Sequence, residues 1–142
     1  SRSTTEFLVV TSMTLFTRII TGEIPGKFVY RDEICVAFLS IHPLRPGHTL
    51  VVPIEPIDHW LDLSPQVLEH LHQVARRIGQ AQMTLYSPKK IGLLFAGLEI
   101  PHAHLHVVPI FEPNDLDFAN ANTAATNQEL DIEAERLRQA LQ

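Results

Sequence analysis

The segment Pro101–Pro109 constrains the fold of this chain most, because histidines alternate in it with apolar residues. Its three histidines are His102, His104 and His106. Since successive side chains of a β-strand point to opposite faces, these imidazoles are predicted to share one face of a strand. Ala103 and Leu105 would then point to the other face, into an apolar core. The segment therefore predicts a strand that is apolar on one side and lined with imidazoles on the other.

Apolar spacing along the rest of the chain predicts an α+β fold, with about five largely antiparallel strands and one long helix packed on the sheet. The strands are expected at residues 28–30, 34–41, 48–52, 91–96 and 102–110, the last two joined by a tight turn at Gly97. A short helix is expected within residues 13–24. The long helix should begin at Ser64-Pro65, as N-cap and first helical residue, and end at Ser87-Pro88.

A last helix should begin with Thr126 and Glu129 in capping-box register. Its apolar stripe comprises Leu130, Ala134, Leu137 and Leu141. This stripe must be buried, and a second subunit is one candidate for the surface that covers it. We expect a single domain over residues 13–142, with its core at 14–110 and a C-terminal tail and helix at 111–142. Residues 1–12 precede the patterned sequence and are expected to be a flexible extension.

Composition limits the classes of partner. The formal net charge is −5, so nucleic acid is not expected as a partner, whereas a local site could still take a small anionic ligand. No apolar run approaches the roughly 20 residues that span a membrane, so no membrane partner is expected and a cytoplasmic location is predicted. The single cysteine, Cys35, lies in an apolar run and is predicted to be a buried hydrophobic residue rather than a reactive thiol.

The three imidazoles would stand about 6.5–7 Å apart along a strand. At this spacing they cannot all be protonated cheaply, so at least one is expected to be neutral at neutral pH. A neutral imidazole flanked by hydrogen-bond donors can attack an anionic phosphorus centre while its neighbours balance the phosphate oxygens. The pattern therefore favours nucleophilic chemistry on phosphorus.

Two other interpretations stay open at this point. The histidines could be ordinary surface or core residues, although strict alternation within an apolar strand argues against this. They could also hold zinc, since His-X-His on a strand can chelate a metal. The outer rings of a straight strand are attached about 13–14 Å apart, too far to share one ion comfortably. A two-histidine site would need a ligand from elsewhere, with His48 as the candidate.

Three stretches together resemble the histidine triad family. Residues 102–108 match its signature, His-φ-His-φ-His-φ-φ with φ apolar. Residues 36–53, which include Gly47-His48, and the opening stretch 15–25 match two further family segments. The resemblance covers residues 14–110 in the family's order, and the chain resembles the family's nucleoside phosphoramidase-like branch. It implies a five-stranded sheet with a long helix packed on it, and a homodimer in which two sheets join into ten strands.

The resemblance also implies roles for individual residues. In this family the middle histidine attacks a nucleotide α-phosphate and forms a covalent nucleotidyl-histidine, which corresponds here to His104. His106 and His102 would hold phosphate oxygens and orient the nucleophile, and His48 would extend the relay to His102. The nucleotide-binding positions are Leu15, Phe16, Ile19, Phe38, Leu39, Ser40, Ile41 and Glu99. Most of these wall the base pocket, whereas Ser40 lies at the ribose and Glu99 is a candidate leaving-group acid.

This chain departs from the family pattern at four places. Ser40 replaces the aspartate that holds the ribose hydroxyls, and Leu98 replaces the glutamine before the triad. The asparagine-containing loop ahead of it is missing. The Cys-X-X-Cys that holds zinc in some members is replaced by Thr14 and Thr17, so no structural zinc is expected. The first three losses weaken the grip on a standard nucleotide but leave the triad intact.

The histidine pattern and what the family resemblance implies together predict an enzyme that cleaves a P–N or P–O bond at a nucleoside monophosphate derivative, without metal or other cofactor. Its expected ligand is a purine nucleotide or a nucleoside phosphoramidate. Two alternatives remain. One is a protein that binds a nucleotide or phosphate metabolite without turnover, which Ser40 and Leu98 favour. The other is a zinc-dependent hydrolase.

Overall fold

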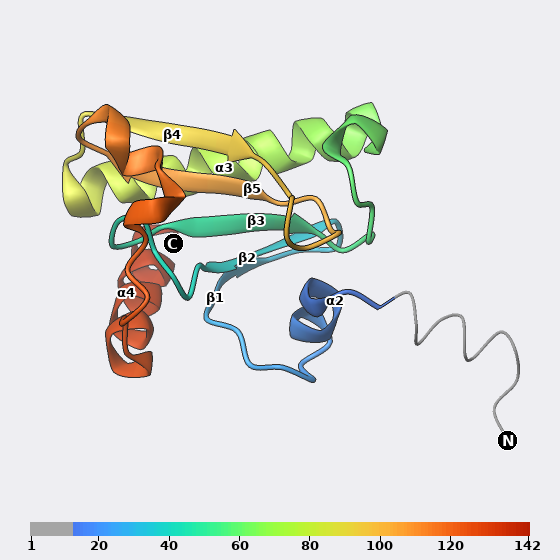
Figure 1. Ribbon diagram of the computed structural model, residues 1–142, viewed down its shortest axis with the longest axis horizontal. Helices are drawn as coiled ribbons and strands as arrows, with labels where there is room; N and C mark the ends of the chain where they lie inside the picture. The colour runs from blue at the N-terminus through green and yellow to red at the C-terminus, as the bar shows by residue number, and fades with distance from the viewer. Residues whose placement is uncertain (1–12) are drawn as a thin grey trace, which may run out of the picture.

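The computed structural model describes residues 13–142 and contains a five-stranded sheet (Figure 1). In chain order its strands are Phe28–Arg31 (β1), Cys35–Leu39 (β2), Thr49–Pro53 (β3), Lys90–Phe95 (β4) and Leu105–Ile110 (β5). The spatial order is β1-β2-β3-β5-β4, and every neighbouring pair is antiparallel. The α+β prediction is therefore confirmed. The prediction that residues 1–12 form a flexible extension lies outside the described residues.

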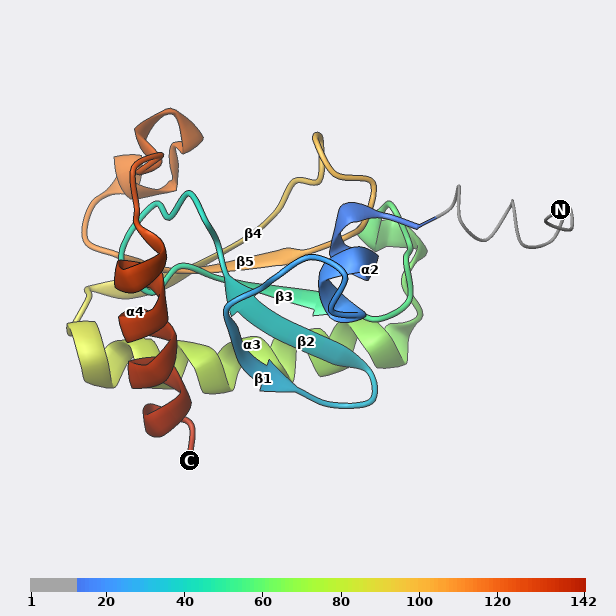
Figure 2. The same cartoon turned by 90° about the horizontal axis from the view of Figure 1, so that it is seen from below.

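The long helix α3, Pro65–Tyr86, covers one face of the sheet, as Figure 2 shows. It begins as predicted, with the Ser64 side chain accepting from the Val67 N–H and Pro65 in the first turn. It ends at Ser87, which adopts the left-handed conformation of a C-cap. Within residues 13–142 no helix is long and apolar enough to cross a membrane.

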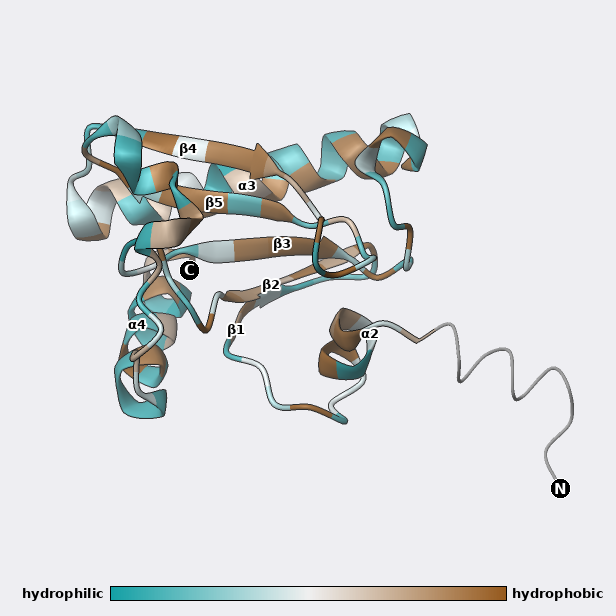
Figure 3. Ribbon diagram, in the orientation of Figure 1, coloured by the Kyte–Doolittle hydropathy of each residue, from teal (hydrophilic) through white to brown (hydrophobic). Residues whose placement is uncertain are grey.

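The two faces of the sheet carry different apolar clusters, because side chains alternate along each strand. Cys35, Ala37 and Leu39 point toward α3 and join the larger core. Val36 and Phe38 point to the opposite face, where the short helix α2, Leu15–Ile20, packs on them through Phe16. Figure 3 shows that hydrophobic residues predominate along the strands, whereas hydrophobic and hydrophilic residues alternate along α3.

The C-terminal helix α4, Asn127–Ala140, packs against its own chain. Its capping box between Thr126 and Glu129 forms as predicted. The inward residues Leu130, Ala134 and Leu137 belong to the core that also contains α3 and β1. The apolar stripe of α4 is thus buried against its own domain and not, as was considered from the sequence, against a second subunit. The homodimer with a joined ten-stranded sheet stays a prediction.

The connection between β4 and β5 differs from the predicted tight turn. β5 begins at Leu105, so residues 96–104 form a loop, with Gly97 at φ 74°. Pairing between the two strands stops at Phe95 and Leu105. His102 and Ala103 instead direct their N–H groups to the carbonyls of Ile100 and Ile57. The prediction of a strand from residue 102 was wrong because these two bonds, one local and one to a distant segment, replace the ladder.

Candidate active site

Four histidines lie together on the sheet face that α3 does not cover. His102 is fully buried, His48 is 1% exposed, and His104 and His106 are each 7% exposed. His106 lies in β5, whereas His102 and His104 lie in the loop just before it and His48 just before β3. The rings of His104 and His106 are 4.9 Å apart between centroids. The structure therefore brings together all the histidines that the sequence singled out.

The ring of His104 is oriented by the backbone two residues earlier. Its Nδ1 lies 2.8 Å from the carbonyl oxygen of His102. Because a carbonyl can only accept, this nitrogen must carry the proton. Burial lowers the pKa of His104, so the ring is neutral near pH 7 and its Nε2 keeps a lone pair. An imidazole with a fixed Nδ1–H and a free Nε2 is suited to nucleophilic attack.

A chain of hydrogen bonds fixes the proton on His106. The Leu44 N–H donates to Nδ1 of His48 at 3.0 Å, so in the neutral ring the proton is on Nε2. That nitrogen lies 2.9 Å from Nδ1 of His106, to which it donates. His106 is left with its proton on Nε2, as a donor. Burial, with a smaller effect of neighbouring imidazoles, lowers the pKa of His48 to about 3 and that of His106 to about 4.

The predicted relay from His48 to His102 was wrong, because His48 pairs with His106. The reason is the register of the sheet, in which Leu50 of β3 is opposite His106 of β5. His48 is two residues before Leu50 on the same face, which makes it a diagonal neighbour of His106.

The buried neutral histidines predict acid sensitivity of the fold. His48 and His106 have pKa values lowered in the folded state, so the unfolded chain takes up protons first as the pH falls below about 6.5. We expect the free energy of unfolding to be fully present above pH 6.5. Below it, the loss is expected to reach about 1.4 kcal/mol per pH unit for each such histidine.

This loss is measured by urea unfolding at a series of pH values between pH 7 and pH 4.5. The series stops at pH 4.5 because the ordinary pKa values of aspartate and glutamate lie below it. Replacing His72, which is exposed on α3, with glutamine should leave the profile unchanged. An unfolding free energy that is constant over this window would contradict the assignment.

Both ring nitrogens of His102 are already bonded within the protein. Nε2 lies 2.7 Å from the carbonyl oxygen of Pro53, and Nδ1 lies 2.6 Å from the hydroxyl of Thr14. The predicted contact of this ring with phosphate oxygens is therefore wrong, since neither nitrogen is free. His102 was also predicted to orient the nucleophile. Its backbone carbonyl fits that role, because it accepts the hydrogen bond from Nδ1–H of His104.

The predicted base pocket is only partly assembled from the expected residues. Phe16, Ile19 and Phe38 are buried together on the histidine face, and the Phe16 ring meets the His104 ring edge-on at 4.9 Å. Leu39 points to the opposite face, into the core beneath α3, so its predicted nucleotide contact was wrong. Leu15 and Ile41 are exposed on the surface.

Ser40, predicted at the ribose, lines a cavity of about 260 Å³ together with His48, whereas Glu99, predicted at the leaving group, lies in the β4–β5 loop. The Ser40 hydroxyl accepts from the N–H of His42 at 3.3 Å. Leu98 is 96% exposed, and Glu99 is exposed beside it in the β4–β5 loop. A cavity of about 190 Å³ lies between this loop and the segment 58–60, and His104 is among its lining residues. Trp60 walls it and stacks on Phe95 at 5.6 Å.

The sequence interpretation missed Phe118, which lies in the tail after β5. Its half-exposed ring meets the His106 ring edge-on, with centroids 5.0 Å apart. Phe118 begins the short 3-10 turn Phe118–Asn120 (η3), which follows another, Pro113–Leu116 (η2). An isolated aromatic residue in an otherwise polar stretch was the only signal that could have indicated this contact.

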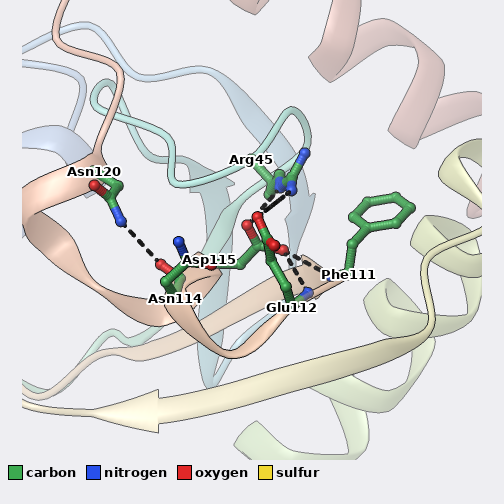
Figure 4. A network of polar contacts seen from close by, with 6 residues as sticks. All are labelled: Arg45, Phe111, Glu112, Asn114, Asp115 and Asn120. Atoms are coloured by element: carbon green, nitrogen blue, oxygen red, sulfur yellow. Dashed lines mark hydrogen bonds and ion pairs between the residues drawn. The ribbon is translucent and has the colours of Figure 1, made fainter.

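A polar network joins the tail after β5 to Arg45 in the loop before β3 (Figure 4). The buried carboxylate of Asp115 accepts from the N–H groups of Phe111 and Glu112 and from the Arg45 guanidinium, at 2.7, 3.1 and 2.8 Å. These bonds lower the pKa of Asp115. Because Arg45 lies in the loop before His48, the network links the tail to the loop that carries one end of the relay.

The four histidines do not form a converging ligand set. Among residues 13–142, one group of three or more potential metal ligands has its atoms within 4.8 Å of one another, and it consists of Asp32, Cys35 and His70. It is remote from the triad, because Cys35 points toward α3 on the other face of the sheet. Asp32 already bonds His70 at 2.6 Å and the Tyr30 hydroxyl at 2.7 Å. The zinc-hydrolase alternative therefore finds no support in the geometry of the triad.

Comparison with known proteins gives a consistent family relationship. The HIT domain family model matches residues 21–112. An uncharacterized HIT-like protein of Borreliella burgdorferi is 32% identical, over 88% of this chain and 91% of its own length. A bis(5'-nucleosyl)-tetraphosphatase of Schizosaccharomyces pombe is 32% identical, over 66% of this chain and 57% of its own length. A hypothetical histidine triad nucleotide-binding protein of Sulfolobus tokodaii superimposes with a TM-score of 0.78 at 26% identity, covering 89% and 90% of the two chains.

Proposed function

This chain belongs to the HIT domain family, and on that premise we propose that it cleaves a P–N or P–O bond at a nucleoside monophosphate derivative. The proposed nucleophile is His104, acting through a covalent nucleotidyl-histidine as a hydrolase or nucleotidyl transferase. The observation that carries the proposal is the bond from Nδ1–H of His104 to the His102 carbonyl, which leaves Nε2 with a lone pair.

The proposed reaction has two displacements. In the first, Nε2 of His104 attacks phosphorus, and the bond to the leaving group breaks with its electron pair. The leaving group takes a proton from solvent or from Glu99, which remains the proposed acid. In the second, water attacks phosphorus and gives up a proton to solvent, the P–Nε2 bond breaks with its electron pair returning to Nε2, and the nucleoside monophosphate departs. Neither displacement uses a metal ion.

His106 would supply the electrostatic stabilisation. The relay from Leu44 through His48 leaves its Nε2–H as a donor whose direction is set before substrate arrives. A preorganised donor at the charge that develops on a phosphate oxygen lowers the barrier without a reorganisation cost. Phe118 on one side and Phe16 on the other would exclude water from this row of imidazoles.

The nucleoside is proposed to bind beside the apolar cluster of Phe16, Ile19 and Phe38, which suits a purine base but would have to open to admit it, because these side chains are buried. The Schizosaccharomyces pombe relative, named for a bis(5'-nucleosyl)-tetraphosphatase activity, supports a nucleotide substrate. The phosphoramidase-like specificity, the homodimer and the cytoplasmic location stay predictions.

The proposal is tested with a panel of adenosine and guanosine phosphoramidates, acyl-adenylates and dinucleoside polyphosphates, each with and without EDTA. We expect turnover of at least one class, insensitive to EDTA. Rapid quenching at alkaline pH should trap label from an α-³²P substrate on the protein, since P–N bonds of phosphohistidine survive base. Turnover that requires added metal would contradict the mechanism.

The non-catalytic alternative predicts a different result with the same panel. Ser40 offers one hydroxyl where the family has a carboxylate, and exposed Leu98 offers no polar group near the leaving group. Saturable nucleotide binding by calorimetry, without turnover of any class or label on the protein, would select a binding protein.

A further inference from the structure

We propose that Thr14 is a positioning residue whose hydroxyl fixes the tautomer and orientation of His102, and thereby the carbonyl that orients His104. The catalytic consequence rests on the proposed function, whereas the proton assignment stands on the hydrogen-bond geometry alone. Thr14 lies just before α2, at a separation of 88 residues from His102 in sequence.

The direction of the bond between the two side chains follows from their other partners. Nε2 of His102 faces the Pro53 carbonyl at 2.7 Å, so this nitrogen carries the proton. The ring is completely buried, and burial lowers its pKa, so it is neutral and its Nδ1 has a lone pair. Nδ1 lies 2.6 Å from the Thr14 oxygen, so the Thr14 hydroxyl must be the donor.

The same hydroxyl oxygen also caps the short helix α2. It accepts from the Thr17 N–H at 3.0 Å and so provides the N-cap of α2. The Thr17 hydroxyl also lies 3.1 Å from this oxygen, and because the single Thr14 proton points to His102, Thr17 must be the donor of that pair. The Thr14 oxygen thus accepts from the helix and donates to His102. The next residue but one, Phe16, meets the rings of both His102 and His104 edge-on, at 5.7 and 4.9 Å. Thr14 therefore connects the start of α2 to the part of the triad that orients the nucleophile.

Loss of the hydroxyl would leave Nδ1 of His102 buried without a donor. An unsatisfied buried acceptor is costly, and the ring can reduce that cost by turning or by moving its proton. Either change disturbs the contact with the Pro53 carbonyl and the loop that contains the His102 carbonyl. His104 would then hold its Nδ1 proton less firmly, so kcat should fall more than KM changes.

The test compares Thr14→Val, which removes only the hydroxyl, with Thr14→Ser, which keeps it. Thr126→Val is the matched control, because Thr126 is also a threonine N-cap, of α4, and its hydroxyl accepts from the Glu129 N–H and bonds none of the four histidines among the described residues. All are measured for thermal stability, for kcat and KM over a range of pH, and by ¹H–¹⁵N NMR of the histidine rings.

We expect the His102 ring in the wild-type protein to show a protonated Nε2 and an Nδ1 that accepts a hydrogen bond. Thr14→Val should lower kcat about 10-fold with little change in KM, alter the pH profile and shift the Nδ1 resonance of His102. Thr14→Ser should restore all of these, while Thr126→Val should lower stability only.

Two results would overturn the proposal. One is a wild-type His102 ring protonated on Nδ1. The other is a Thr14→Val variant that matches Thr126→Val in every measurement, which would reduce Thr14 to a helix cap. If the wild-type protein turned over no substrate, the proposed function would fail, while the NMR arm would still decide the proton assignment at His102.

Discussion

Replacing His104 with asparagine is expected to reduce kcat by on the order of 10⁴-fold or more, because it removes the atom that forms the covalent bond to phosphorus. Asparagine is smaller than histidine and its amide can still donate to the His102 carbonyl, so the fold should persist. Steady-state turnover of the best substrate in the panel, with the base-stable label on the protein, measures both the rate and the intermediate.

A matched control for this variant is His72→Asn. His72 is exposed on α3, where its Nδ1 bonds the Leu68 carbonyl and its ring meets Phe95 edge-on at 6.2 Å, and it makes no hydrogen bond to the four histidines among the described residues. Its replacement should leave kcat unchanged. A His104→Asn protein that keeps its nucleotide affinity but loses turnover and label would agree with the mechanism. Retention of more than a tenth of wild-type kcat would rule out His104 as the nucleophile.

Replacing Leu137 with alanine is expected to lower the free energy of unfolding by about 2–5 kcal/mol, the usual cost of a cavity left by a buried leucine. Leu137 is completely buried where α4 meets the core of its own chain. The loss follows from removed apolar contacts that cannot fully collapse. Urea unfolding monitored by the fluorescence of Trp60, the single tryptophan, provides the measurement.

The control lies on the same helix. Ile132→Ala removes a side chain that is 54% exposed, and its effect should stay within about 0.5 kcal/mol. Equal effects of the two variants would mean that α4 does not pack on the core as described. A loss at Leu137 that depends on protein concentration would instead indicate that a second subunit covers this helix.

Much of the fold could be predicted because local signals determine it. The Ser64-Pro65 start of α3 and the Thr126–Glu129 capping box of α4 each depend on a few neighbouring residues, and both formed as predicted. The sequence could not show which surface covers the apolar stripe of α4. An amphipathic pattern states that a face is buried, but contains no information on whether its own core or another subunit covers it.

The partners of the histidines could not be derived from their spacing. Whether His48 reaches His102 or His106 depends on how β3 is registered on β5, which is a long-range property of the sheet. The loss of strand pairing before Leu105 likewise depends on the Ile57 carbonyl, which accepts from Ala103 across the fold. The shared face of the triad was nevertheless predicted correctly, because His104 remains beside His106 at the entry to β5.

Burial of Cys35 makes the chain suitable for chemical labelling without further engineering. The thiol is completely inaccessible, and burial raises its pKa to about 12, so it should not react with maleimides or iodoacetamides in the folded protein. A cysteine introduced at the fully exposed position of Leu98 would then be the only reactive thiol. A fluorophore attached there would report on substrate arrival from the rim of the site, in a protein whose native cysteine stays in place.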